Sequence, residues 1–241
     1  MEGIQFVLFD ISEDLVKAWQ RAFAQHVPDA ARGRFTITLS TNEDLSFPAE
    51  QFDCIVSPAN SYGRLDGSFD YYLAKELAPP ARFEAPTEIA QAVLYRQWRG
   101  YAPPGTCTLV PLKGTVCADN KYGCGYIALC PTMRIPETVT WNREVVYNCM
   151  WSLLVALDQH NASVGASGSA TEGEAATRIK KVLMAGLATG VGRVSAERCA
   201  QQMALAVKHY VDACENPQKW SSLSWNDALD YAQEANDTHS L

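Results

Sequence analysis

The chain has 241 residues, of which 47% are hydrophobic and 20% charged, and its formal net charge is −7. This composition is typical of a globular protein with a sizeable core, and the negative charge argues against a general nucleic-acid surface, which needs clustered lysine and arginine. No apolar run approaches the ~20 residues that span a membrane, and the N-terminus lacks a basic-then-apolar signal. We therefore expect a cytoplasmic or nuclear location and no membrane partner.

Eight cysteines and four histidines are spread along the chain without the spacing of metal ligands, and no Cys-x-x-Cys pair occurs. Most of the cysteines lie in apolar segments. Free, buried thiols in a reducing compartment are the expectation from this usage. We expect no disulfide scaffold, no bound metal and no cofactor.

Short apolar runs predict strands at residues 4–9, 35–39, 52–56, 105–113, 125–130 and 181–186. Apolar residues at helical spacing predict helices after the capping residues Ser12 and Ser195 and at residues 69–77, 89–99 and 143–160. The opening β-α-β order favours parallel pairing and an α/β fold.

The domain organisation follows from composition along the chain. We predict a single domain over residues 1–215, in which the strand and helix at 1–34 extend the core at its N-terminal side. Residues 161–176 are small and polar and predict a mobile surface loop. Residues 216–241 form a C-terminal appendage, and Trp220 and Trp225 predict that its first half docks on the body.

The segment 52–75 carries the first candidate site. A buried strand ends at Ser57-Pro58, and a polar loop with two glycines at 61–68 leads into a helix. A loop at the carboxyl end of a parallel strand is where open α/β sheets bind small molecules. Asn60 at the strand end and Asp70 near the helix start therefore present an amide and a carboxylate to one cleft.

A second glycine-rich loop, at residues 186–193, lies between the last strand and the helix that Ser195 caps. It lacks the glycine spacing and lysine of a P-loop, and it does not match the dinucleotide fingerprint. Consecutive backbone N–H groups beside a helix N-terminus suit a diphosphate. Taken alone, such a turn is also compatible with a purely structural role in packing.

Together the two loops resemble those of the macro domain family. Ser57-Pro58-Ala59-Asn60 followed by residues 66–70 is similar to its first ligand loop, usually close to Asn-Ala-Ala-Asn and then Gly-Gly-x-Asp. Residues 183–199 are similar to its diphosphate-binding turn, in which a Thr-Gly-x-Gly loop precedes a helix. Residues 131–134, Pro-Thr-Met-Arg, recur in the subset that has Ser-Pro-Ala-Asn at the first loop. The resemblance covers roughly residues 35–214.

The resemblance implies a three-layer α-β-α sandwich with a mixed, mostly parallel central sheet, and ADP-ribose or a derivative as ligand. It implies that the terminal ribose and the diphosphate are held by residues of the two loops: Ala59, Asn60, Gly67, Ser68, Thr189, Gly190, Val191, Gly192 and Arg193. Asp70 is the candidate general base for hydrolysis, with Asn60 positioning the sugar. For Asp70, stabilisation of its helix N-terminus is the alternative.

Four positions leave alternatives open. Asp10 either meets the adenine amino group or a ribose hydroxyl, or it stabilises the helix that follows it. The family's adenine aspartate follows its second strand in a Gly-Asp-Ile type turn; residues 41–44 do not match it cleanly, and the side-chain oxygen of Asn42 is the substitute acceptor. Ser68 replaces a family glycine and either crowds the ribose or donates a new hydrogen bond. Arg134 either faces an anionic substrate group or pairs with an acidic residue on the rim.

Two functions remain from the sequence. The first is a hydrolase acting on ADP-ribose that carries a group at its terminal ribose. The resemblance suggests ADP-ribose 1″-phosphate, a by-product of transfer-RNA splicing, or a mono-ADP-ribosylated protein as its substrate. The alternative is a non-catalytic module that binds ADP-ribose or a related nucleotide. An unrelated α/β nucleotide binder is a third reading, which the match of both loops disfavours.

Overall fold

The computed structural model describes residues 3–40, 47–48, 50–166 and 176–241. Its strands are β1 (Gln5–Asp10), β2 (Phe35–Leu39), β3 (Cys54–Ser57), β4 (Thr108–Pro111), β5 (Tyr126–Leu129) and β6 (Lys181–Met184). Its helices are α1 (Glu13–His26), α2 (Asp29–Arg32), α3 (Ser68–Leu77), α4 (Ala85–Trp98), α5 (Val145–Ala166), α6 (Ala196–Glu215), α7 (Pro217–Trp220) and α8 (Trp225–Asn236).

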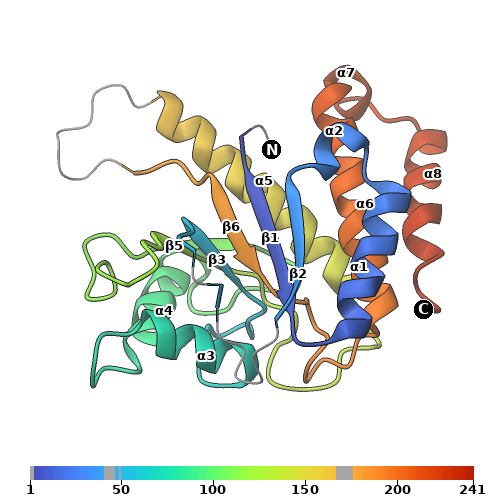
Figure 1. Ribbon diagram of the computed structural model, residues 1–241. Coiled ribbons are helices and arrows are strands. Elements are labelled where there is room, and N and C mark those ends of the chain that lie inside the picture. The colour runs from blue at the N-terminus through green and yellow to red at the C-terminus, as the bar shows by residue number, and fades with distance from the viewer. Residues whose placement is uncertain (1–2, 41–46, 49, 167–175) are drawn as a thin grey trace.

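Within this described part the strands form one six-stranded sheet of order β2-β1-β6-β3-β5-β4 (Figure 1). Every neighbouring pair is parallel except β4 and β5, which are antiparallel. The carboxyl ends of β1, β6, β3 and β5 therefore meet at one edge. Such an edge collects the loops that follow the strands, which is where α/β sheets bind ligands.

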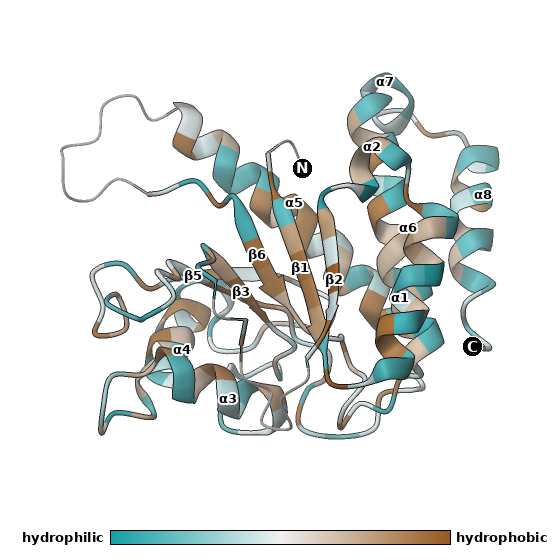
Figure 2. Cartoon of the chain, viewed as in Figure 1, coloured by the Kyte–Doolittle hydropathy of each residue, from teal (hydrophilic) through white to brown (hydrophobic). Residues whose placement is uncertain are grey.

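Each central strand buries both of its faces. In β1, Phe6 and Leu8 belong to the core beneath α1, α5 and α6, whereas Val7 and Phe9 belong to a second core beneath α3 and α4. This alternation follows from the period of two along a strand. Apolar residues accordingly fill the strands and the sheet-facing sides of α1 and α6 (Figure 2). The predicted mixed, mostly parallel α-β-α sandwich is confirmed.

Two predicted helix boundaries were wrong. Helix α4 begins at Ala85 rather than at residue 89, because Pro86 occupies the first turn, where the missing N–H costs no hydrogen bond. Helix α5 continues to Ala166, so residues 161–166 are helical and only 167–175 of the predicted loop lie outside the described residues. Asn161 holds this extension in place: its amide donates to the carbonyl of Ile179 at 2.7 Å and accepts from the Ile179 N–H at 2.8 Å.

The C-terminal segment packs against α5 and α6 through one of its two tryptophans. The ring of Trp220 stacks on Trp151, with 5.5 Å between centroids, and its N–H donates to Asp212 at 2.8 Å. Trp225 is 85% exposed and takes no part in this docking. In the part of the chain that the structure describes, no helix has both the length and the apolar character to cross a membrane.

Candidate functional site

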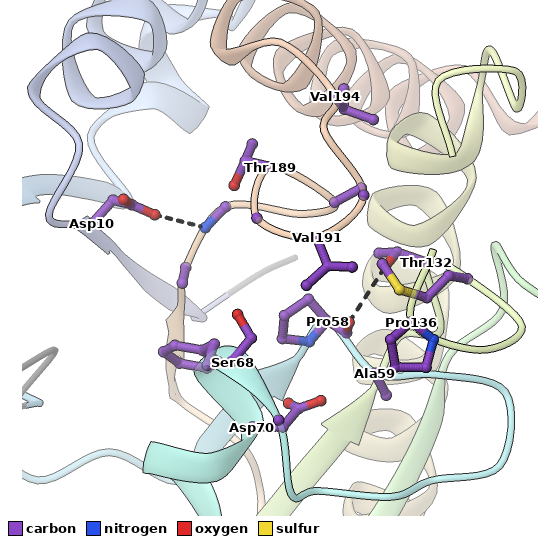
Figure 3. A pocket seen from close by; sticks show the side chains of 18 of the residues that line it. Asp10, Pro58, Ala59, Ser68, Asp70, Thr132, Pro136, Thr189, Val191 and Val194 are labelled. Carbon is purple, nitrogen blue, oxygen red and sulfur yellow. Dashed lines mark hydrogen bonds between the residues drawn. The ribbon is translucent and has the colours of Figure 1, made fainter. Parts of the chain in front are cut away.

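A cavity of about 490 Å³ opens at the carboxyl edge of the sheet. Four segments line it: the turn from β1 into α1, the loop from Pro58 to Asp70, residues 132–136, and the loop from β6 into α6 (Figure 3). Its volume lies within the range of small-molecule sites, roughly 300–1,000 Å³. The two loops that the sequence singled out, at residues 61–68 and 186–193, thus share one cavity.

The second loop presents unpaired backbone N–H groups to this cavity. The N–H groups of Thr189, Gly190, Val191 and Gly192 have no acceptor among the described residues. The N–H groups of the next two residues donate within the loop instead. That of Arg193 bonds to the Gly190 carbonyl at 3.1 Å, and that of Val194 bonds to the Ala188 carbonyl at 3.0 Å. Consecutive free N–H groups beside a helix N-terminus form an anion-binding concavity.

Two of the three glycines in this loop, Gly190 and Gly192, have different roles. A Cβ on Gly192 would lie 2.5 Å from the carbonyl oxygen of Ala188, so only glycine fits there. A Cβ on Gly190 would meet only the Ser68 hydroxyl, at 3.4 Å, so a side chain at this position would project into the cavity. Gly192 therefore shapes the loop, and Gly190 leaves space for a ligand.

Helix α3 points its N-terminus at the same cavity. Its first residues, Ser68, Phe69 and Asp70, line the cavity together with Gly67, and no side chain caps the helix. Ser68 adopts the left-handed conformation, with φ 53°, and its hydroxyl has no hydrogen-bond partner within the described chain. Uncapped N–H groups of a first turn are available to a ligand. Ser68 and Gly190 thus face each other across the cavity.

Asp70 is the most perturbed carboxyl group of the site. It is 7% exposed, and Ser57 donates a hydrogen bond of 2.6 Å to its Oδ1. Burial raises the pKa of Asp70 from 3.8 to about 7, with a smaller contribution from the charge of Asp66, while the Ser57 hydrogen bond opposes the rise. A carboxyl group with a pKa near neutrality can accept or donate a proton at physiological pH.

Asn60 lines the cavity, but its amide bonds to its own loop. Its Nδ2 donates to the Arg64 carbonyl at 2.8 Å, and its Oδ1 accepts from the N–H groups of Tyr62 and Arg64 at 3.1 and 3.4 Å. Asn60 therefore folds the loop back on itself and sets the position of Arg64, whose guanidinium pairs with Asp66 at the rim.

Asp10 stabilises the helix that follows it, which is one of the two alternatives from the sequence; its contact with a ligand stays a prediction. Its Oδ1 accepts from the N–H of Ser12 at 2.9 Å, which stabilises the start of α1, and Ser12 in turn caps Leu15. Its Oδ2 accepts a longer bond, 3.4 Å, from the Gly186 N–H of the second loop, and the side chain also lines the cavity (Figure 3). Asp10 thus ties the β1 turn to the second loop at the cavity wall.

The remaining predicted site residues divide into three groups. Ala59, Gly67 and Thr189 line the cavity as expected. Arg193 is exposed and does not line it: with φ 55° its side chain leaves the loop on another side. Asn42 lies outside the described residues.

Several lining residues were not predicted from the sequence. Thr132, Met133 and Pro136 close the cavity beside the first loop. The Pro-Thr-Met-Arg segment did signal this region, although only its arginine was predicted to face a substrate. Ser57, the partner of Asp70, carried a signal too: a serine that ends an apolar strand is expected to be buried and then needs a polar partner, and the structure does bury it.

Comparison with known proteins gave matches among solved structures alone. No family model matches the chain, and no curated protein matches it. The chain is similar to a macrodomain of Oceanobacillus iheyensis with ADP, at 14% identity and a TM-score of 0.45, covering 67% of this chain and 73% of that chain. The same macrodomain with MES bound is similar at 12% identity and a TM-score of 0.42, covering 78% of this chain and 86% of that chain. A mutant of that macrodomain with ADPR is similar at 14% identity and a TM-score of 0.37, covering 68% of this chain and 89% of that chain.

Proposed function

We propose that this protein binds ADP-ribose and hydrolyses a group from its terminal ribose. The observation that carries the proposal is the row of free N–H groups from Thr189 to Gly192, which faces Ser68 and Asp70 in one cavity of about 490 Å³. A diphosphate is the anion that fits such a row, since each N–H can donate to a phosphate oxygen. The N-terminus of α6, whose first residue Ala196 also lines the cavity, adds a favourable helix dipole.

The β1 turn supplies the adenine end in this proposal. Asp10 and Ile11 line the cavity and follow a central strand, so they offer an Asp-Ile pair of the kind that the family turn uses. The Asp10 carboxylate accepts hydrogen bonds, and the adenine amino group donates them. Adenine recognition is therefore assigned to Asp10. Asn42 remains a predicted contributor.

The first loop supplies the terminal ribose end. Asp70 in its ionised form takes a proton from a water molecule, whose oxygen bonds to C1″ of the ribose as the bond between C1″ and the substituent breaks. The substituent leaves with the proton, and ADP-ribose remains. Asn60 contributes by holding, through its amide, the loop that surrounds the ribose, rather than by bonding to the ribose itself. A phosphate at the 1″ position and an acidic side chain of a protein are the two candidate leaving groups.

A specific observation favours the alternative function, a non-catalytic ADP-ribose binder. All the hydrogen bonds of the Asn60 amide run within its own loop, and the Ser68 hydroxyl narrows the cavity opposite Gly190. In that case Asp70 serves only to bind the ribose hydroxyls. Turnover distinguishes the two functions.

Calorimetric titration with ADP-ribose tests the shared part of the proposal. We expect micromolar binding by the wild type and no measurable binding by Gly190→Glu, because the new side chain places a negative charge where the diphosphate would lie. Gly33→Glu is the matched control: this glycine has open space around it and lies at the end of α2. Absence of binding by the wild type would refute the proposal.

Release of phosphate from ADP-ribose 1″-phosphate, and of ADP-ribose from a modified protein, tests the catalytic part. We expect one of the two reactions in the wild type and a loss of at least about a hundredfold in Asp70→Asn, the usual contribution of a general base. Micromolar binding without either reaction would leave the non-catalytic function.

A further inference from the structure

Beside the cavity mouth, an arginine and two tyrosines from three segments form a cluster that the proposed chemistry does not use. The Nε of Arg134 donates to the Tyr62 hydroxyl at 3.2 Å, and its guanidinium carbon lies 5.0 Å from the centroid of the Tyr101 ring. The two rings are 5.7 Å apart. We call Tyr62, Tyr101 and Arg134 the rim cluster.

Buried Ser61 joins the three segments rigidly. Its N–H donates to the carbonyls of Met133 and Arg134, at 2.9 and 3.2 Å, and its hydroxyl also donates to Met133. Its own carbonyl accepts from the Ala102 N–H at 3.0 Å. The rim cluster therefore stands on a backbone that is fixed before any partner arrives, which lowers the entropy cost of binding.

The rim cluster begins directly outside the cavity. Asn60 and Met133 both line the cavity and form a β-bridge with each other, and Tyr62 and Arg134 follow them by two residues and one residue. Arg134 itself does not line the cavity. A group bonded directly to the ribose would stay inside, whereas a chain that leaves the ribose through this side of the mouth would cross the rim cluster.

The charge of Arg134 is not paired within the part of the chain that the structure describes. Nothing in the described chain forms an ion pair with it, and none of its terminal N–H groups has an acceptor there. Glu137 is close enough to raise the pKa of Arg134 slightly, behind the larger effects of Tyr62 and Tyr101, but it does not pair with the guanidinium. A guanidinium held by one tyrosine hydroxyl and one tyrosine ring, with its two terminal nitrogens free, is suited to bind a carboxylate in bidentate geometry.

We propose that the rim cluster binds an acidic polypeptide segment that carries the ADP-ribose held in the cavity. The inference rests on the proposed function and names its substrate class: a mono-ADP-ribosylated protein with carboxylates next to the modified residue. Tyrosine and arginine are the residue types that dominate protein–protein contacts. A nucleic acid is the poorer partner, because its phosphates need several clustered cations, whereas this site offers one guanidinium on a chain of net charge −7.

The test uses two synthetic peptides that carry ADP-ribose through a non-hydrolysable linkage, one flanked by glutamates and one by glutamines. Fluorescence polarisation gives the affinity of each peptide, and calorimetry gives the affinity of free ADP-ribose. Three proteins are compared: the wild type, Arg134→Gln, and the control Arg32→Gln, which removes the same charge from exposed α2.

We expect the wild type and Arg32→Gln to prefer the glutamate peptide about five- to tenfold, the effect of one charge-assisted contact at a partly exposed site. Arg134→Gln should bind both peptides equally and free ADP-ribose as the wild type does. A wild type that binds ADP-ribose but does not distinguish the peptides overturns the inference alone, as does a preference that survives in Arg134→Gln. A wild type that binds neither ADP-ribose nor the peptides overturns the proposed function with it.

Discussion

Replacing Asp70 by asparagine should change how the stability of the protein depends on pH. The pKa of the buried carboxyl is about 7, well above its ordinary 3.8, so the folded protein keeps this proton to a higher pH than the unfolded chain. The contribution of Asp70 to the free energy of unfolding is therefore fully present below about pH 4 and is lost as the pH rises towards 7. Between pH 5 and pH 8 the loss amounts to about 2.5 kcal/mol.

Urea unfolding followed by tryptophan fluorescence at pH 5, 6, 7 and 8 measures this loss. The pH dependence of all other groups is shared by the wild type and Asp70→Asn, so the difference between their curves isolates Asp70. On going from pH 5 to pH 8, the free energy of unfolding of Asp70→Asn should rise by about 2.5 kcal/mol relative to that of the wild type. Asp29→Asn, which removes an exposed carboxylate from α2, is the control. Parallel curves for wild type and Asp70→Asn would refute the assignment of a raised pKa.

Three further variants test other parts of the structure. Ser68→Gly relieves a left-handed φ of 53° and should raise the free energy of unfolding by about 0.5–1 kcal/mol, seen as a melting temperature about 2 °C higher; a lower one would contradict the strain. Gly192→Ala places a Cβ 2.5 Å from the Ala188 carbonyl and should cost about 1–3 kcal/mol in urea unfolding, whereas an unchanged midpoint would show that the loop yields freely. Trp220→Ala removes the stack on Trp151 and should lower the free energy of unfolding by about 2 kcal/mol. Residues 216–241 should then become sensitive to limited proteolysis, while the affinity for ADP-ribose stays unchanged. Continued protection of these residues would mean that other contacts hold them.

The sequence indicated the fold because its strongest signals are local. The strand β1 contains an unbroken apolar run from Phe6 to Phe9, which is what a strand buried on both faces requires. Ser12 and Ser195 mark the starts of α1 and α6 because a capping side chain bonds within three residues of itself. The end of α5 could not be predicted in this way. Asn161 continues that helix by bonding to the backbone of Ile179, a partner that only the fold brings near.

The sequence predicted which residues lie near the candidate site better than it predicted where their side chains point. Spacing placed Asp70 and Gly190 in one cavity, since both follow parallel strands whose ends meet at one edge of the sheet. Spacing did not show that Arg193 lies outside the cavity lining. Its left-handed backbone conformation directs the side chain differently from an extended conformation, and the sequence does not reveal that conformation. The role of Asn60 could not be predicted either. An asparagine at this position is equally suited to hydrogen bonds within the loop and to hydrogen bonds with a ligand, so the sequence does not distinguish the two roles.

Backbone strain connects these observations to binding. Ser68, Ala188 and Arg193 are three of the five non-glycine residues with positive φ in the described chain, and all three belong to the two loops of the cavity. Each such residue costs about 1–2 kcal/mol, so the surrounding fold must hold it in place. Ala188 and Arg193 flank the four residues whose N–H groups have no acceptor among the described residues. Because the fold fixes the loop, the diphosphate of the proposed ligand would not need to order it on binding, which would lower the entropy cost of that binding.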